Sequence, residues 1–118
     1  MSDEVAFLVE HINRSPEPLH ADFTNEVRAL VRIGLPAARA VLPLLLSPDE
    51  LTRLRAQRVL EGVSRDVVAD TWGADWALLW HENGNYHWRA EAELRQSAVG
   101  KWLAWLDQAA ARAPRKQA

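Results

Sequence analysis

The arginine residues of this sequence have a spacing that could serve in binding. Arg28 and Arg32 are four residues apart, which places both on one face of a helix. Three more follow on a later predicted helix: Arg53, Arg55 and Arg58. A strip of guanidinium groups could contact an acidic protein or a nucleic acid. Acidic residues interrupt the strip, so we favour a solvated surface of mixed charge over that contact role; they are Glu26, Glu50 and Glu61.

One apolar residue on the later helix is out of place. At about 100° per residue, Leu54 falls among polar residues, opposite the side of the helix expected to be buried. Either a neighbouring helix covers it, which we favour, or it is an exposed apolar contact. Together with Arg28, Arg32 and Arg58 it forms the predicted partner-binding set.

All six tryptophans lie between Trp72 and Trp105. Trp72, Trp76 and Trp80 recur every four residues, and Trp102 and Trp105 are three apart, so two helices are predicted to present facing aromatic stripes. Such stripes could stack on sugars, nucleobases or peptide side chains. Because an open helical stack must cover its last apolar face, we favour a structural role for these indoles.

No pattern in the sequence indicates catalysis or metal binding. There is no cysteine, no Gly-x-Ser-x-Gly and no glycine-rich phosphate loop. His81, Glu82, His87 and Glu91 have the residue types of metal ligands, but the histidines are six residues apart rather than four, and a third ligand is lacking. We therefore expect no enzymatic activity, no metal and no cofactor.

Length and charge narrow the class of protein. A chain of 118 residues is long enough for one domain. Its formal net charge of −2 argues against an electrostatic nucleic-acid binder. The N-terminus is acidic rather than signal-like, and no apolar run approaches the roughly 18–20 residues of a membrane span. We expect a cytoplasmic protein without membrane contact, as a monomer or a weak homo-oligomer.

Hydrophobic periodicity predicts helices throughout and no convincing strand. Prolines at 16 and 18 end the first helix, Asp22 or Thr24 caps the second, Gly34 ends it, and Pro43 is expected to bend the third. The last three helices are predicted over 49–63, 74–82 and 89–112, the final one with Leu94, Ala98, Trp102 and Trp105 on one side. Short links make neighbours antiparallel, which gives three hairpins and favours an α-solenoid over a compact bundle.

One repeat-like stretch carries a recognisable pattern. Gly34 ends a helix, Pro36 opens the next, Pro43 lies inside it, and Asp49 and Arg55 are six residues apart, a pattern that resembles a HEAT repeat. The resemblance implies an all-α fold, a short right-handed α-solenoid of about three antiparallel helical hairpins. It also implies that the Asp and the Arg hydrogen-bond between turns and neighbouring repeats.

The Trp-rich end resembles the segment that follows HEAT-like repeats in some uncharacterised bacterial proteins, which implies a closing cap and no known activity. We expect one helical domain over 1–112, with repeat-like hairpins in 1–63, a capping hairpin in 72–112 and a basic tail in 113–118. The residues expected to build the cap are Trp76, Trp80, Trp102 and Trp105.

These features predict a non-enzymatic module for protein–protein interaction or scaffolding. It would bind an unidentified protein through the surface formed by the second helix of each hairpin. Two alternatives remain: a small HEAT-like nucleic-acid-binding or DNA-processing protein, and a fragment or capping piece of a larger repeat assembly. The first alternative requires a concave cleft with a carboxylate beside aromatic and arginine side chains.

Overall fold

The computed structural model describes residues 3–69 and 73–112, and this part of the chain contains six α-helices, as predicted. Trp72 and the basic tail at 113–118 lie outside the described residues. None of the described helices is both long and apolar enough to cross a membrane. The elements are, in chain order, α1 (Asp3–Glu10), β1 (Pro16–Glu17), β2 (His20–Thr24), α2 (Asn25–Ile33), α3 (Leu35–Val41), the 3-10 helix η1 (Leu42–Leu46), α4 (Glu50–Val68), α5 (Ala74–Glu82) and α6 (Ala92–Arg112).

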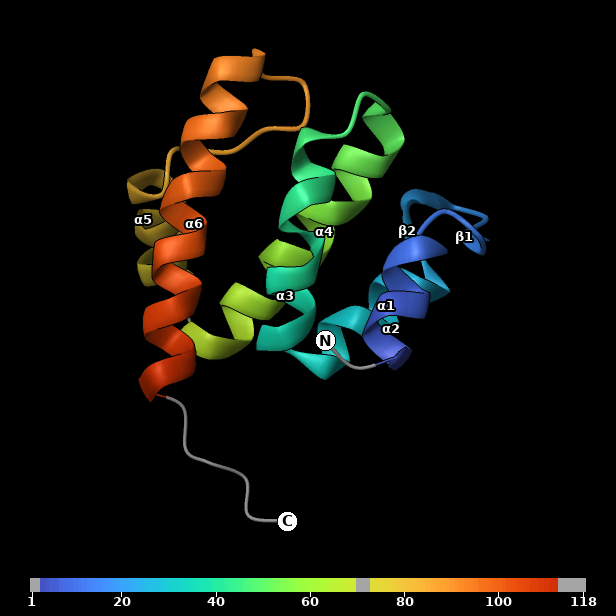
Figure 1. Cartoon of the computed structure of the whole chain (residues 1–118), viewed down its shortest axis with the longest axis horizontal. Coiled ribbons are helices and arrows are strands. Elements are labelled where there is room, and N and C mark those ends of the chain that lie inside the picture. The colour runs from blue at the N-terminus through green and yellow to red at the C-terminus, as the bar shows by residue number, and fades with distance from the viewer. Residues whose placement is uncertain (1–2, 70–72, 113–118) are drawn as a thin grey trace.

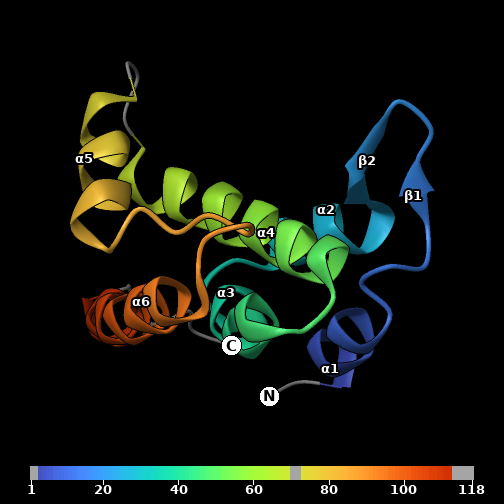
Figure 2. The same cartoon turned by 90° about the horizontal axis from the view of Figure 1, so that it is seen from above.

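Helix α3 and η1 lie in the middle of the molecule, and α4 packs against both (Figures 1 and 2). On one side of this centre lie α1, α2 and the β-hairpin, with α1 and α2 against α3, and α2 and β2 against α4. On the other side, α6 packs against α3 and η1, and α5 packs against α4. Two flanks therefore share one centre.

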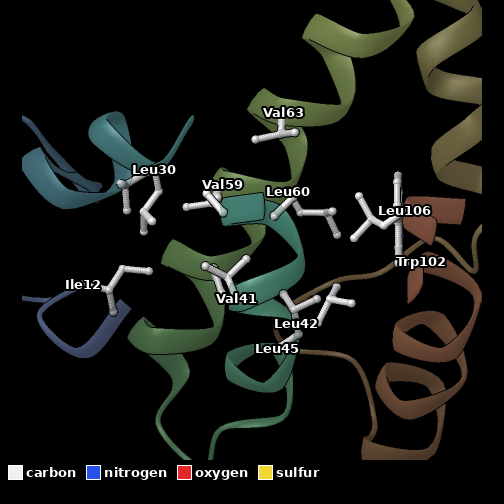
Figure 3. Close-up of a cluster of buried hydrophobic side chains, with 14 of the residues drawn as sticks. Ile12, Leu30, Val41, Leu42, Leu45, Val59, Leu60, Val63, Trp102 and Leu106 are labelled. Carbon is white, nitrogen blue, oxygen red and sulfur yellow. The ribbon is translucent and has the colours of Figure 1, made fainter. Parts of the chain in front are cut away.

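The hydrophobic core joins both flanks through this centre (Figure 3). The predicted inward residues of α4 are almost fully buried: Ala56, Val59, Leu60 and Val63. They belong to one cluster with side chains from the other elements, namely Leu30 of α2, Val41 of α3, Leu42 and Leu45 of η1, and Trp102 and Leu106 of α6. Removing this apolar surface from water stabilises the fold by about 25 cal/mol per Å².

The start of the third helix is as predicted, and its middle is not. Gly34 separates α2 from α3 with a φ of +94°, which favours glycine, and Pro36 lies in the first turn of α3. The prediction of a bent α-helix around Pro43 is wrong. Helix α3 ends at Val41 and the chain continues as η1, because proline has no N–H to donate to the carbonyl four residues earlier.

The prediction of no strand is also wrong, since β1 and β2 form an antiparallel hairpin. Proline favours extended backbone for itself and for the residue before it, so a segment interpreted as a helix stop is equally suited to a strand. The hairpin pairs Pro16 with Thr24 and Glu17 with His20. It brings the carboxylates of Glu17 and Asp22 within reach of arginines on α2 and α4.

The last helix begins at Ala92 rather than at Arg89. The segment before it runs along α4, where Arg53 Nε donates to the Trp88 carbonyl at 2.8 Å and the Trp88 N–H donates to Gln57 Oε1 at 3.0 Å. These long-range bonds hold the segment outside the helix.

Two further details of the helices differ from the prediction. Helix α4 continues to Val68 instead of ending at 63, which adds Arg65 to it. Leu94 is 60% exposed and does not share the buried side of α6. Eight residues separate it from Trp102, which turns it about 80° around the helix.

Candidate functional site

Helices α2 and α4 lie side by side. Asp22, just before α2, pairs with Arg58, and Val31 near the end of α2 lies against Gly62. Figures 1 and 2 show both helices running in the same general direction. The two helices thus present one continuous surface.

Each of these helices begins at a side-chain cap. Thr24 Oγ1 accepts from the Val27 N–H at 3.0 Å, so Thr24, and not Asp22, is the cap of α2. Asp49 Oδ2 accepts from the hydroxyl of Thr52 at 2.7 Å and from its N–H at 2.9 Å. These two bonds lower the pKa of Asp49.

The surface between α2 and α4 is hollowed, with a volume of about 650 Å³. Gly62 permits the close approach of the helices, since a Cβ at this position would meet both γ-carbons of Val31 at 2.8 Å. We call the residues that line this space the arginine hollow: Asp22, Phe23, Arg28, Val31, Arg32, Arg58, Glu61, Gly62 and Arg65.

Two of its arginines are bound to carboxylates. Arg28 holds Glu17 through two bonds, from Nε to Oε2 at 2.6 Å and from Nη2 to Oε1 at 3.1 Å. Arg58 donates from Nε to Asp22 Oδ2 at 2.6 Å and from Nη1 to Glu61 Oε1 at 2.7 Å. The positive charge of both guanidinium groups is therefore compensated within the protein.

The two carboxylates from the β-hairpin have lowered pKa values. For Glu17 the hydrogen bond from Arg28 is the main cause. For Asp22, partial burial raises the pKa, but the hydrogen bond from Arg58 and a backbone hydrogen bond together outweigh it. Both groups are ionised at neutral pH, which keeps the two ion pairs intact.

Arg32 and Arg65 have no ion-pair partner within the described residues, and both are exposed. Arg32 lies about one turn beyond Arg28 on α2, and Arg65 about two turns beyond Arg58 on α4. The Arg65 guanidinium carbon lies 4.0 Å from the centre of the Trp76 ring. The uncompensated positive charge thus gathers toward the C-terminal ends of α2 and α4.

The structure brings the predicted partner-binding set together in part. Arg28, Arg32 and Arg58 line the arginine hollow, whereas Leu54 is half-buried and lies outside it. The remaining members of the predicted strip point elsewhere and are buried, Arg53 at 7% and Arg55 at 5% exposure.

Sequence reasoning missed Arg65, Phe23 and Gly62 as parts of this surface. The signal for Arg65 was its distance of seven residues from Arg58, which repeats one face of a helix. It was overlooked because the predicted helix ended at 63. Nothing in the sequence indicated that Phe23 and Gly62 would meet across two helices.

The two polar residues of the HEAT-like pattern, Asp49 and Arg55, hydrogen-bond to different parts of the chain. Arg55 donates from Nε and Nη2 to the Ala21 carbonyl at 3.0 and 2.9 Å, and from Nη1 to Asn13 Oδ1 at 2.8 Å. It thereby links α4 to the chain before α2. Asp49 instead caps α4 through its bonds to Thr52.

The four tryptophans expected to build the cap form one connected cluster. The ring centroids are 5.4 Å apart for Trp76 and Trp80, 5.2 Å for Trp80 and Trp102, and 5.4 Å for Trp102 and Trp105. Trp102 is fully buried and the other three are half-buried. Trp76 Nε1 donates to Ser64 Oγ of α4 at 2.8 Å. The indoles thus join α5 and α6 to each other and to α4.

The two histidines considered as possible metal ligands contact residues that are close to them in the sequence. His81 Nδ1 and Asn85 Nδ2 are 2.8 Å apart, and His87 Nδ1 accepts from the Arg89 N–H at 3.0 Å. Across residues 3–69 and 73–112, no three His, Asp or Glu side chains are grouped so that they could hold a metal ion.

No protein-family model matches this chain, and neither does a curated protein or a solved structure. The resemblance to HEAT repeats therefore stays a prediction. The function has to be inferred from the geometry of the arginine hollow.

Proposed function

We propose that this protein is a non-enzymatic interaction module that binds another protein at the arginine hollow. The observation that carries the proposal is the gathering of four arginines from two parallel helices around one space of about 650 Å³. Spaces of about 300–1,000 Å³ accept a ligand or a short part of a partner. Arginine is also enriched among the residues that dominate binding energy in protein interfaces.

The groups of the hollow suit recognition rather than bond cleavage. Its two carboxylates, Asp22 and Glu61, both accept hydrogen bonds from Arg58. The surface left for a partner consists of guanidinium groups beside the apolar side chains of Phe23 and Val31. Such a surface can hold charged and apolar parts of a partner at once.

The fold proposed with this function is a short right-handed HEAT-like α-solenoid. In it, α1–α2 and α3–α4 are stacked hairpins, and α5–α6 is a Trp-rich cap. Support comes from the parallel packing of α2 and α4, because second helices of successive repeats lie in this way. Gly34 and Pro36 at the boundary of the hairpins also agree with it.

Photo-crosslinking tests the function because it captures any protein that lies against the hollow. In one variant p-benzoylphenylalanine replaces Phe23, which keeps an aromatic ring in the hollow. In the matched control it replaces Phe7, an exposed ring of α1 that does not line the hollow. Each variant is irradiated in cells of the native host.

We expect a discrete protein adduct from position 23 and none from position 7. Absence of an adduct at position 23, or the same adducts at both positions, would contradict the proposal.

A further inference from the structure

We infer that the arginine hollow recognises an acidic peptide segment of its partner, whose carboxylates bind Arg32 and Arg65. The inference rests on the proposed function and adds to it the chemical class of the bound segment. The four arginines of the hollow differ in whether a carboxylate of the described residues pairs with them.

Arg28 and Arg58 are occupied within the protein. Each makes two hydrogen bonds of 2.6–3.1 Å to carboxylates that the chain itself supplies. A ligand would have to break such charge-assisted bonds before it could use these groups. Arg32 and Arg65 need no such exchange, because no carboxylate of the described residues pairs with them.

The local charge opposes the charge of the whole chain. The lining carries four arginines and two carboxylates, while the chain has a net charge of −2. An acidic segment is therefore attracted to this part of the surface in particular. Over about 8–10 Å the attraction survives physiological salt.

Arg65 is held in a geometry that suits a carboxylate. Its guanidinium lies over the ring of Trp76, and that indole is fixed in turn by its bond to Ser64. Stacking occupies the flat face of a guanidinium and leaves its N–H edge free to donate to a bidentate partner. Less side-chain entropy is then lost when a carboxylate binds.

A peptide fits this surface better than a nucleic acid. A nucleic-acid strand presents a phosphate at every nucleotide, and some of them would face Glu17, Asp22 and Glu61. A peptide can place acidic side chains at Arg32 and Arg65 and neutral or apolar ones elsewhere. The ring of Phe23 and the methyl groups of Val31 provide contacts for the latter.

The test uses a display library of random peptides about ten residues long, selected against the full chain. Selected peptides are then labelled, and their affinities are measured by fluorescence polarisation. An oligothymidylate of the same length is measured beside them as a nucleic-acid probe. We expect selected peptides to be enriched in Asp and Glu, to bind more weakly as salt is raised, and to bind more tightly than the oligothymidylate.

The decisive variant is R32E/R65E, and its matched control is K101E/R112E. The control makes the same change of charge at exposed positions of α6, on the other flank (Figure 1). We expect the affinity to fall roughly tenfold or more in R32E/R65E and to stay within about twofold in the control. R32Q/R65Q removes the charges without adding anions, and we expect it to weaken binding as well. It replaces R32E/R65E as the test if the glutamates disturb the fold.

Four outcomes would overturn the inference: no peptide selected, no enrichment in acidic residues, equal losses in both charge variants, or tighter binding of the oligothymidylate. If any one of them occurs while the crosslink from position 23 forms, the proposed function stands and only the acidic segment is wrong. If the crosslink is absent as well, both are wrong.

Discussion

The two flanks of the molecule are attached to α4 by different chemistry. On the side of α1, α2 and the β-hairpin, guanidinium groups of α4 reach across to the Ala21 carbonyl and to Asp22. On the side of α5 and α6, Trp76 bonds to Ser64 of α4 and contacts Trp80, which in turn contacts Trp102 of α6. Polar bonds of α4 on this side reach the backbone of Trp88, in the segment before α6. Helix α4 thus has a polar side, which faces α1, α2 and the β-hairpin, and an aromatic side, which faces α5 and α6.

The difference accounts for the position of the proposed binding surface. A guanidinium group bound to two acceptors fixes direction and distance, and it keeps charge near the surface. An indole covers a large apolar area and leaves little charge for a partner. The polar flank can therefore serve recognition, while the aromatic flank contributes mainly to stability.

Replacing Trp102 with alanine removes the centre of the aromatic side. Because Trp102 is fully buried, the free energy of unfolding should fall by about 3–5 kcal/mol. Urea denaturation followed by circular dichroism measures the change. Trp102→Phe should cost less, since a ring remains and the indole N–H has no acceptor within the described residues. A loss below about 1 kcal/mol for the alanine variant would contradict the assigned role.

Replacing Arg55 with alanine tests the polar side. The substitution removes a buried side chain, 5% exposed, together with its hydrogen bonds to the Ala21 carbonyl and the Asn13 side chain, so we expect a loss of about 2 kcal/mol. Arg32→Ala is the control, because this exposed side chain should change stability by no more than about 0.5 kcal/mol. Equal losses in the two variants would show that Arg55 does not hold the polar flank to α4. Chemical denaturation of both proteins measures the two losses.

Replacing Gly62 with alanine tests the close packing of α2 on α4. The new methyl group would meet Val31 at 2.8 Å, and the strain should exceed the gain in helix propensity, for a net loss of about 1 kcal/mol. Gly100 of α6 has open space at the same position, so Gly100→Ala should stabilise the protein instead. Thermal unfolding of the pair gives the two signs. Stabilisation by both substitutions would contradict the close approach.

Tyr86 links the aromatic side to η1. The pH dependence of its contribution to stability is confined to alkaline pH. Burial raises its pKa to about 12, although the charges of Arg95 and Arg53 act in the opposite direction. Since the folded pKa lies above the unfolded value of about 10, its contribution to stability is complete below pH 10 and is lost as the pH rises toward 12.

Tyr86 is the only tyrosine, so tyrosinate absorbance follows this group alone. We expect Tyr86→Phe to lose less stability than the wild type between neutral and alkaline pH. An absorbance titration with a midpoint near the ordinary value would contradict the burial of this hydroxyl.

On the polar side, Asp22 makes a contribution to stability that depends on pH in the acidic range. Its folded pKa is lowered, so the stabilisation is present above the unfolded value of about 3.9 and is lost as the pH falls through the folded value. Asp22→Asn should therefore flatten the acid limb of the stability curve. Unfolding curves recorded from neutral to acidic pH measure the slope, and an unchanged slope would show that the pair with Arg58 does not contribute.

The helices and much of the core follow from local patterns in the sequence. Apolar residues at helical spacing identified the buried side of α4, and Gly34 and Pro36 marked the boundary between α2 and α3. These signals are local, because backbone preferences and the period of a helix act over a few residues. The facing tryptophans were predictable for the same reason.

Long-range contacts set the hairpin, the path of the segment before α6 and the division of the arginines into groups with and without an ion-pair partner among the described residues. Arg28 and Arg58 are bound to carboxylates 11 and 36 residues away, whereas Arg32 has no ion-pair partner in the part of the chain described. All three look alike in the sequence. Their difference arises because a carboxylate compensates an arginine through space, and the fold alone sets which carboxylate comes within reach.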